Sequence, residues 1–144
     1  MSRIVSFRGK IANDSVDTIV LHTTDGSMGY RIVKFQIISA SPGTDNEEAI
    51  VQIFKTPQTT PSTEIDFSDQ TLLACAFSAA SSNAYYAGED NIIFDSEVFN
   101  QDIYVTYKSQ LGSTAFNYYI ELEQMPLDLN ENTVATLKDI RNLA

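Results

Sequence analysis

The sequence predicts an all-β fold, an antiparallel β-sandwich or jelly-roll-like domain with a short C-terminal helix. Three observations predict it: apolar and polar residues alternate with a period of two, turn-forming residues separate the alternating segments at short intervals, and only the last residues show a helical period. A parallel α/β fold would need helices between strands, and the intervening segments are too short and too rich in Pro, Ser and Thr. We expect the sandwich domain to span residues 1–128 and the helical segment residues 129–144.

The strand signal is clearest near the C-terminus, where every second residue is apolar: Phe116, Tyr118, Ile120 and Leu122. Residues 30–38 show a similar alternation. Val, Ile, Thr, Tyr and Phe, which suit a pleated and packed surface, dominate the alternating segments. The predicted strands are residues 4–11, 18–23, 30–39, 49–55, 71–78, 91–95, 103–108 and 114–124.

Turn residues divide these strands. Asp25-Gly26 predicts a hairpin between the second and third strands, because Gly adopts a positive φ at little cost, and residues 111–113 predict a hairpin between the last two. Pro, Gly and Asn predict loops at residues 41–46 and 56–63. Residues 74–87 are rich in small residues, which leaves a short helix, a close-packed strand and a loop as open alternatives.

The C-terminal segment has the spacing of an amphipathic helix, with apolar residues at Val134, Leu137, Ile140 and Leu143. Asn130 or Asn132 would cap its start, and Lys138 and Arg141 would suit the negative end of its dipole. The apolar stripe would either close the open edge of the sandwich or dock on a neighbouring subunit.

The charge balance argues against several classes of partner. Nine Lys and Arg against nineteen Asp and Glu give a net charge of −10, which repels nucleic acid and anionic lipid, and the few basic residues look scattered along the chain. No apolar run is long enough to span a membrane, and the N-terminus lacks the pattern of a secretory signal. We therefore expect no nucleic-acid or membrane partner.

Residues for catalysis or metal binding are few. His22 is the single histidine and Cys75 the single cysteine, so an internal disulfide is excluded and most nucleophile–base pairs and transition-metal sites are disfavoured. We interpret His22 as an ordinary strand or hairpin-end residue and Cys75 as a small buried hydrophobe. Three acid-rich loops keep calcium open as a ligand, although none has the spacing of a calcium loop. We expect no enzyme and no cofactor; cleavage of glycans by paired carboxylates remains a minor alternative.

Exposed tyrosines favour interfaces because they offer apolar area together with a hydroxyl group. Tyr85-Tyr86 lies among small residues and is one candidate, with core packing as the alternative. Together with the C-terminal stripe, the candidate partner interface is Tyr85, Tyr86, Val134, Leu137, Ile140, Arg141 and Leu143.

Three segments of the C-terminal third, DIYVTYK at 102–108, FNYYIELE at 116–123 and TLKDIRN at 136–142, resemble small virion structural proteins of marine tailed bacteriophages. In that family a final hairpin precedes a short helix, and the resemblance covers residues 100–143. It implies a non-enzymatic virion protein, made in the host cytoplasm, that decorates or cements the capsid as a homo-oligomer in contact with other virion proteins, chiefly the major capsid protein. The alternative is a tail- or fibre-associated recognition module that binds host-surface glycan.

Overall fold

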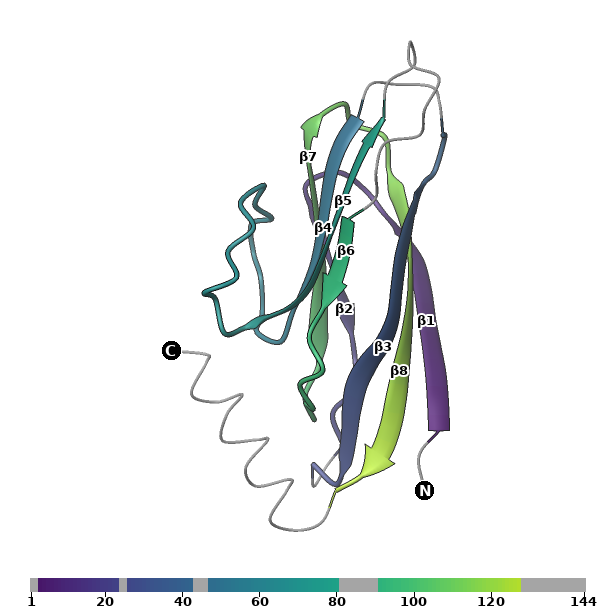
Figure 1. Cartoon of the computed structure of the whole chain (residues 1–144), viewed down its shortest axis with the longest axis vertical. Helices are drawn as coiled ribbons and strands as arrows, with labels where there is room; N and C mark the ends of the chain where they lie inside the picture. Colours follow the sequence, from purple (N-terminus) through teal and green to yellow (C-terminus); the bar gives the residue numbers. More distant parts are fainter. Residues whose placement is uncertain (1–2, 24–25, 43–46, 81–90, 128–144) are drawn as a thin grey trace.

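The computed structural model describes residues 3–23, 26–42, 47–80 and 91–127. There, eight strands form two antiparallel sheets packed against each other, which confirms the predicted β-sandwich (Figure 1). The predicted C-terminal helix and the domain boundary at residue 128 lie outside the described residues. The strands are β1 (Arg3–Ile11), β2 (Ser15–Ile19), β3 (Met28–Ser39), β4 (Glu47–Phe54), β5 (Leu72–Ala80), β6 (Asn91–Phe94), β7 (Ile103–Leu111) and β8 (Phe116–Pro126).

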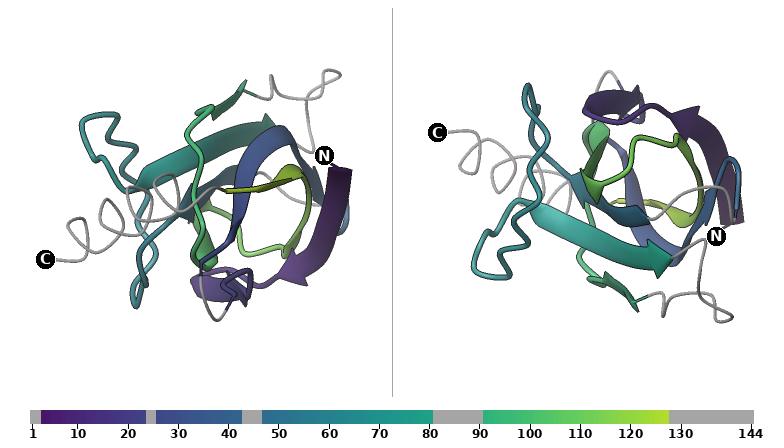
Figure 2. Two further views of the ribbon diagram at one scale, coloured as in Figure 1. Left: turned by 90° about the horizontal axis from the view of Figure 1, so that it is seen from below. Right: turned by 90° about the horizontal axis from the view of Figure 1, so that it is seen from above.

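The pairing of the strands is nested. One sheet has the order β1-β8-β3 and the other β2-β7-β4-β5-β6, so the first strand pairs with the last, the second with the next to last, and β4 with β5. The fourth nested pair would be β3 with β6. In its place a single bridge joins Tyr30 in β3 to Phe99, which follows β6. This nested order is that of a jelly roll, and the end-on views show the strands curving around a shared interior (Figure 2).

Both predicted hairpins are wrong, because the strands they were meant to pair lie in different sheets. β2 and β3 are separated in this way, and so are β7 and β8. The predicted local conformation is nevertheless present, since Gly26 and Gly112 have φ values of 68° and 84°. A glycine turn reverses the chain equally well within a sheet or between two sheets. Crossing between sheets lets the apolar faces of both flanking strands reach one core.

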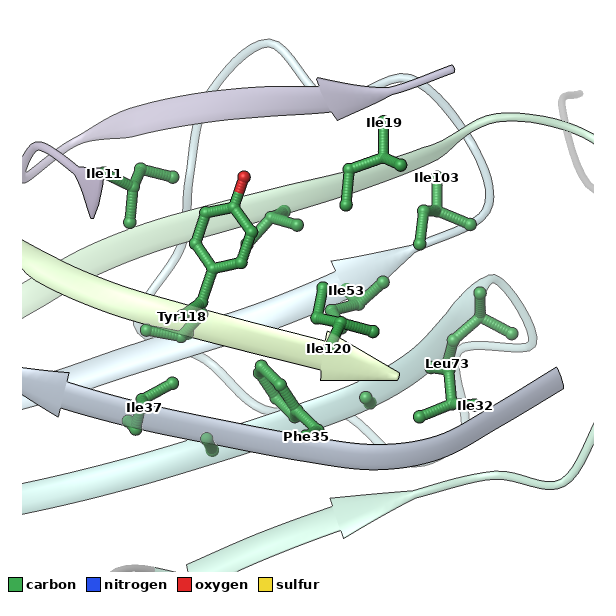
Figure 3. Close-up of a cluster of buried hydrophobic side chains, with 14 of the residues drawn as sticks. Ile11, Ile19, Ile32, Phe35, Ile37, Ile53, Leu73, Ile103, Tyr118 and Ile120 are labelled. Atoms are coloured by element: carbon green, nitrogen blue, oxygen red, sulfur yellow. The ribbon is translucent and has the colours of Figure 1, made fainter. Parts of the chain in front are cut away.

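The core forms where the inward faces of the two sheets meet (Figure 3). All four apolar residues that predicted β8 are buried there, together with Phe35 from β3 and Ile53 and Ile103 from the other sheet. Burial of each such side chain contributes roughly 2 kcal/mol. Residues 74–80 belong to β5, so the close-packed strand is the correct alternative for that part of the small-residue segment.

The connection between β4 and β5 lies against the outer face of the five-stranded sheet (Figure 1). Gln52 fastens it there, because its side-chain amide donates to the carbonyl oxygens of Ser62 at 3.3 Å and Glu64 at 3.1 Å. Thr106, Gln52 and Cys75 occupy neighbouring register positions across the sheet and are all buried. The predicted burial of Cys75 is thus confirmed.

Candidate interaction surfaces

Exposed apolar side chains gather at the free edge of the five-stranded sheet. β6 is the edge strand, and its Ile93 and Phe94 are 54% and 39% exposed. Phe67, from the connection that covers β4 and β5, is 68% exposed. With the residues between Leu72 and Cys75 these three line a depression of about 480 Å³. We call Phe67, Ile93 and Phe94 the edge patch.

Polar groups border the edge patch and fix its shape. Asp69 accepts hydrogen bonds from the backbone NH and the hydroxyl of Thr71 at 2.9 and 2.7 Å. The backbone NH of Asp95 donates to the carbonyl of Leu73 at 2.8 Å, which holds the end of β6 on β5. Among the described strands none pairs with the outer edge of β6, and an apolar surface with a polar border at such an edge is typical of a site that contacts another protein.

A second surface is the outer face of the three-stranded sheet, where the fold gathers basic residues. Four of the nine Lys and Arg residues lie on this face, Arg8 and Lys10 from β1 and Arg31 and Lys34 from β3. With the two acids of β8 they give the face a net charge of +2 in a chain of −10. The basic residues are scattered along the sequence, as expected, but four of them meet on this face. They are separated in sequence because β1 and β3 are distant along the chain, but both strands pair with β8.

The register of the sheet arranges this outer face in rows of three side chains. Two rows line a shallow depression of about 510 Å³, together with Gly9 and Tyr118. The rows, written from β1 through β8 to β3, are Lys10–Asn117–Ile38, Arg8–Tyr119–Gln36 and Ser6–Glu121–Lys34.

The acidic half of this face is internally bonded. Arg31 donates from Nε and Nη2 to Glu123 Oε1 at 2.9 and 2.5 Å. The hydroxyl of Tyr119 donates to Glu121 Oε2 at 2.7 Å, and this hydrogen bond to a carboxylate raises the pKa of Tyr119. The Lys34 ammonium lies 5.9 Å from the centre of the Tyr119 ring. Both acids of β8 thus have partners on the same face.

His22 and Asp102 tie two connections together. His22 Nδ1 lies 2.6 Å from Asp102 Oδ1, and the same oxygen accepts the backbone NH groups of Leu21 and His22 at 2.9 and 3.0 Å. Partial burial raises the pKa of Asp102, but the hydrogen bonds from the His22 ring and from the two NH groups outweigh it and bring the pKa below its usual value. His22 lies after β2 and not at a hairpin end, so its predicted location is wrong.

Across residues 3–23, 26–42, 47–80 and 91–127, no three His, Cys, Asp or Glu side chains are grouped to hold a metal ion. No helix within those ranges has the length and apolarity to cross a membrane. Asp95 and Glu97 belong to one of the three acid-rich loops at which calcium was left open, and both have protein partners: Glu97 binds Lys55, and Asp95 accepts the NH of Glu97.

The predicted interface residues, Tyr85, Tyr86, Val134, Leu137, Ile140, Arg141 and Leu143, all lie outside the described residues. The structure instead reveals the edge patch and the basic outer face. The second had a signal in the sequence, because Arg8 and Lys10 lie two residues apart in a predicted strand and must share a face. The edge patch had none, since it joins β6 to a residue of a distant connection.

Comparison with known proteins gives no assignment: no protein-family model matches the sequence, and no curated protein is significantly similar to it.

Proposed function

We propose that this chain is a non-enzymatic structural protein of a tailed-bacteriophage particle, which decorates or cements the capsid by binding other particle proteins. The edge patch is the observation that carries the binding role. The assignment to a virion is supported by the resemblance over residues 100–143. Two segments of that resemblance are the strands β7 and β8, which cross between the sheets and do not form the family's final hairpin.

The edge patch supports binding to another protein because its apolar side chains are exposed to water, which is unfavourable in free energy. Phe67 and Ile93 are more than half exposed although both are large and apolar. A contact that covers them removes apolar surface from water at about 25 cal/mol per Å². The neighbouring edge of β6 also offers backbone groups to an added strand. A protein partner satisfies both features at once.

The chemistry of the two rare side chains supports a role without catalysis. Cys75 is buried and burial raises its pKa, which is the opposite of the activated thiolate that a nucleophile requires. His22 is held by Asp102 as in a catalytic triad, but within the described residues no Ser, Thr or Cys side chain bonds to its ring. A His–Asp pair without a third member fits a structural tie between connections.

The binding role is tested with purified particles of the virus that encodes the chain. Particles stripped of the protein are incubated with the wild type or with Phe67→Ser, and bound protein is measured by co-sedimentation. We expect Phe67→Ser to weaken binding at least tenfold, because a buried aromatic side chain contributes about 1.5–3 kcal/mol. Cryo-electron microscopy of the loaded particles then locates the chain.

Val20→Ser is the matched control, because Val20 is 67% exposed and lies in a different connection. It should bind as the wild type does. Equal binding of wild type and Phe67→Ser would exclude the edge patch as the contact. A chain that is absent from intact particles, and that does not bind stripped ones, would overturn the virion assignment.

A further inference from the structure

We infer that the depression on the outer face of the three-stranded sheet binds an acidic saccharide, a short glycan that carries carboxylate or sulfate groups. The site is formed by Lys10, Asn117, Arg8, Tyr119 and Gln36 with Ile38 at its border. It lies on the opposite sheet from the edge patch, so it does not depend on the proposed assembly function.

Charge is the first reason for an anionic ligand. The outer face of this sheet has a net charge of +2, while the residues outside its three strands sum to −13, so a positive face belongs to a strongly negative chain. Because the chain as a whole is negative, it attracts an anion only close to the face that carries the cations. Arg8 and Lys10 both lie at the depression, on the strand next to Asn117 and Tyr119.

Free hydrogen-bonding capacity is the second reason. Within the described residues, the side chains of Arg8, Lys10, Gln36 and Asn117 form no hydrogen bond or ion pair with one another or with their neighbours. The adjoining half of the face differs, because Arg31, Glu121 and Glu123 are bonded there. Donors without a hydrogen bond or ion pair within the described residues are therefore concentrated at the depression, and the one other such cation of this face, Lys34, lies in the adjoining row with its ammonium 5.9 Å from the centre of the Tyr119 ring.

The combination of side chains selects a saccharide among anions. Asn117 and Gln36 each offer both a donor and an acceptor, which suits hydroxyl groups that also donate and accept. Tyr119 lies between Arg8 and Gln36 in its row and supplies an aromatic surface for the C–H groups of a sugar ring. A volume of about 510 Å³ is within the range of pockets that hold small ligands.

Two other anions fit less well. Nucleic acid carries a charge every few ångströms along its length and would meet the −13 of the remaining chain. An acidic peptide would use backbone pairing at a sheet edge, whereas this site lies on the face of a sheet. A glycan with one charge per sugar needs only the few cations that are present.

The test is a titration of the full chain with tetragalacturonate, followed by NMR of the backbone amides. We expect the shifts to concentrate in β1, β8 and β3, and we expect maltotetraose, which is neutral, to bind at least tenfold more weakly. A sulfated tetrasaccharide distinguishes sulfate from carboxylate as the preferred group, and binding of either one supports the inference. Tetraglutamate has the charge of the uronate without its rings and should also bind at least tenfold more weakly.

Variants distinguish a specific binding site from non-specific electrostatic attraction of an anion to the protein. Arg8→Gln and Lys10→Gln should each weaken tetragalacturonate binding about tenfold, because each removes a charge-assisted hydrogen bond. Lys108→Gln removes the same charge from the other sheet and should leave binding unchanged. Asn117→Ala should weaken binding without altering its dependence on salt.

Three results would overturn the inference: equal binding of tetraglutamate, which would indicate an acidic protein partner, an equal loss in Lys108→Gln, or no binding of either acidic saccharide at millimolar concentration. Each is distinguishable from failure of the proposed assembly function, which is read from particle binding by Phe67→Ser.

Discussion

Tyr118 in β8 donates its hydroxyl proton to Asp17 Oδ2 in β2 at 3.0 Å and so links the two sheets across the core. Figure 3 shows the Tyr118 ring pointing away from β8 into the space between the sheets. Burial raises the pKa of Tyr118, and the Asp17 carboxylate raises it further, so the hydroxyl keeps the proton that it donates. Gly9, the partner of Tyr118 in β1, leaves room for the ring: a Cβ there would lie 2.8 Å from the hydroxyl oxygen.

This contact predicts coupled effects of two substitutions. Tyr118→Phe should lower the free energy of unfolding by about 1 kcal/mol, because a hydrogen bond to a carboxylate is lost. Gly9→Ala should lower it by about 1–3 kcal/mol through overpacking. In the double variant the new methyl group no longer contacts a hydroxyl group. The loss of unfolding free energy in the double variant should therefore be smaller than the sum of the losses in the two single variants. Urea denaturation of the four proteins measures this, and strict additivity would show that Gly9 does not make room for the hydroxyl.

The pair Lys55–Glu97 predicts a larger effect. Lys55 Nζ donates to both carboxylate oxygens of Glu97 at 2.9 Å, and the Lys55 side chain is 1% exposed. Glu97→Gln should lower the free energy of unfolding by about 1.5–3 kcal/mol, because it replaces two charge-assisted hydrogen bonds to a buried ammonium with a neutral one. Lys55→Met combined with Glu97→Gln should restore most of the loss in the same denaturation experiment.

Glu64→Gln is the control for Glu97→Gln, because Glu64 is exposed and lies in the connection between β4 and β5, which also contains Lys55. It should change the stability by less than about 0.5 kcal/mol. A similar small change in Glu97→Gln would mean that water reaches the Lys55 ammonium and replaces the carboxylate.

Local residue patterns predicted the strands because the alternation of apolar and polar residues can be recognised from a few consecutive residues. The apolar residues of β8 alternate over four positions, and each of them is buried. Which strand pairs with which was not predictable, since Gly26 and Gly112 have the backbone of a hairpin turn and yet connect two sheets. Pairing depends on which apolar faces can share a core, and that is a property of the whole chain.

The candidate surfaces show the same division. Arg8 and Lys10 could have been placed on one face from their spacing, but their position beside Gln36 depends on the pairing of β8 with both neighbours. The edge patch brings Phe67 beside β6 through a connection that has no periodic pattern. The spacing of residues in the sequence does not predict sites that are formed by such irregular connections.

Asp102 predicts a dependence of stability on pH. Its folded-state pKa is lowered, so its carboxylate stabilises the fold above the unfolded pKa of about 3.9, and this contribution is lost as the pH falls through the folded value. Asp102→Asn keeps an acceptor for the NH groups of Leu21 and His22 but lacks the charge. It should be less stable than the wild type at pH 7, and the difference should shrink at about pH 3. Denaturation midpoints at both pH values measure this; a difference that stays constant would assign the loss to geometry and not to charge.

The reactivity of the Cys75 thiol should report on opening of the connection that covers the five-stranded sheet. The thiol is buried next to Gln52, whose amide holds that connection by two hydrogen bonds. Loss of both bonds in Gln52→Ala should cost about 2 kcal/mol of local stability. If a thiol reagent reaches Cys75 only after local opening, its labelling rate should rise about thirtyfold, which is measured under native conditions.

Gln58→Ala is the matched control for Gln52→Ala. Gln58 lies in the same connection, but its amide bonds only to Thr56, two residues away. The labelling rate should therefore stay near that of the wild type, because no contact between the connection and the sheet is lost. Equal acceleration in both variants would show that labelling follows general loosening of the connection, and rapid labelling of the wild type would show that the connection does not shield the thiol.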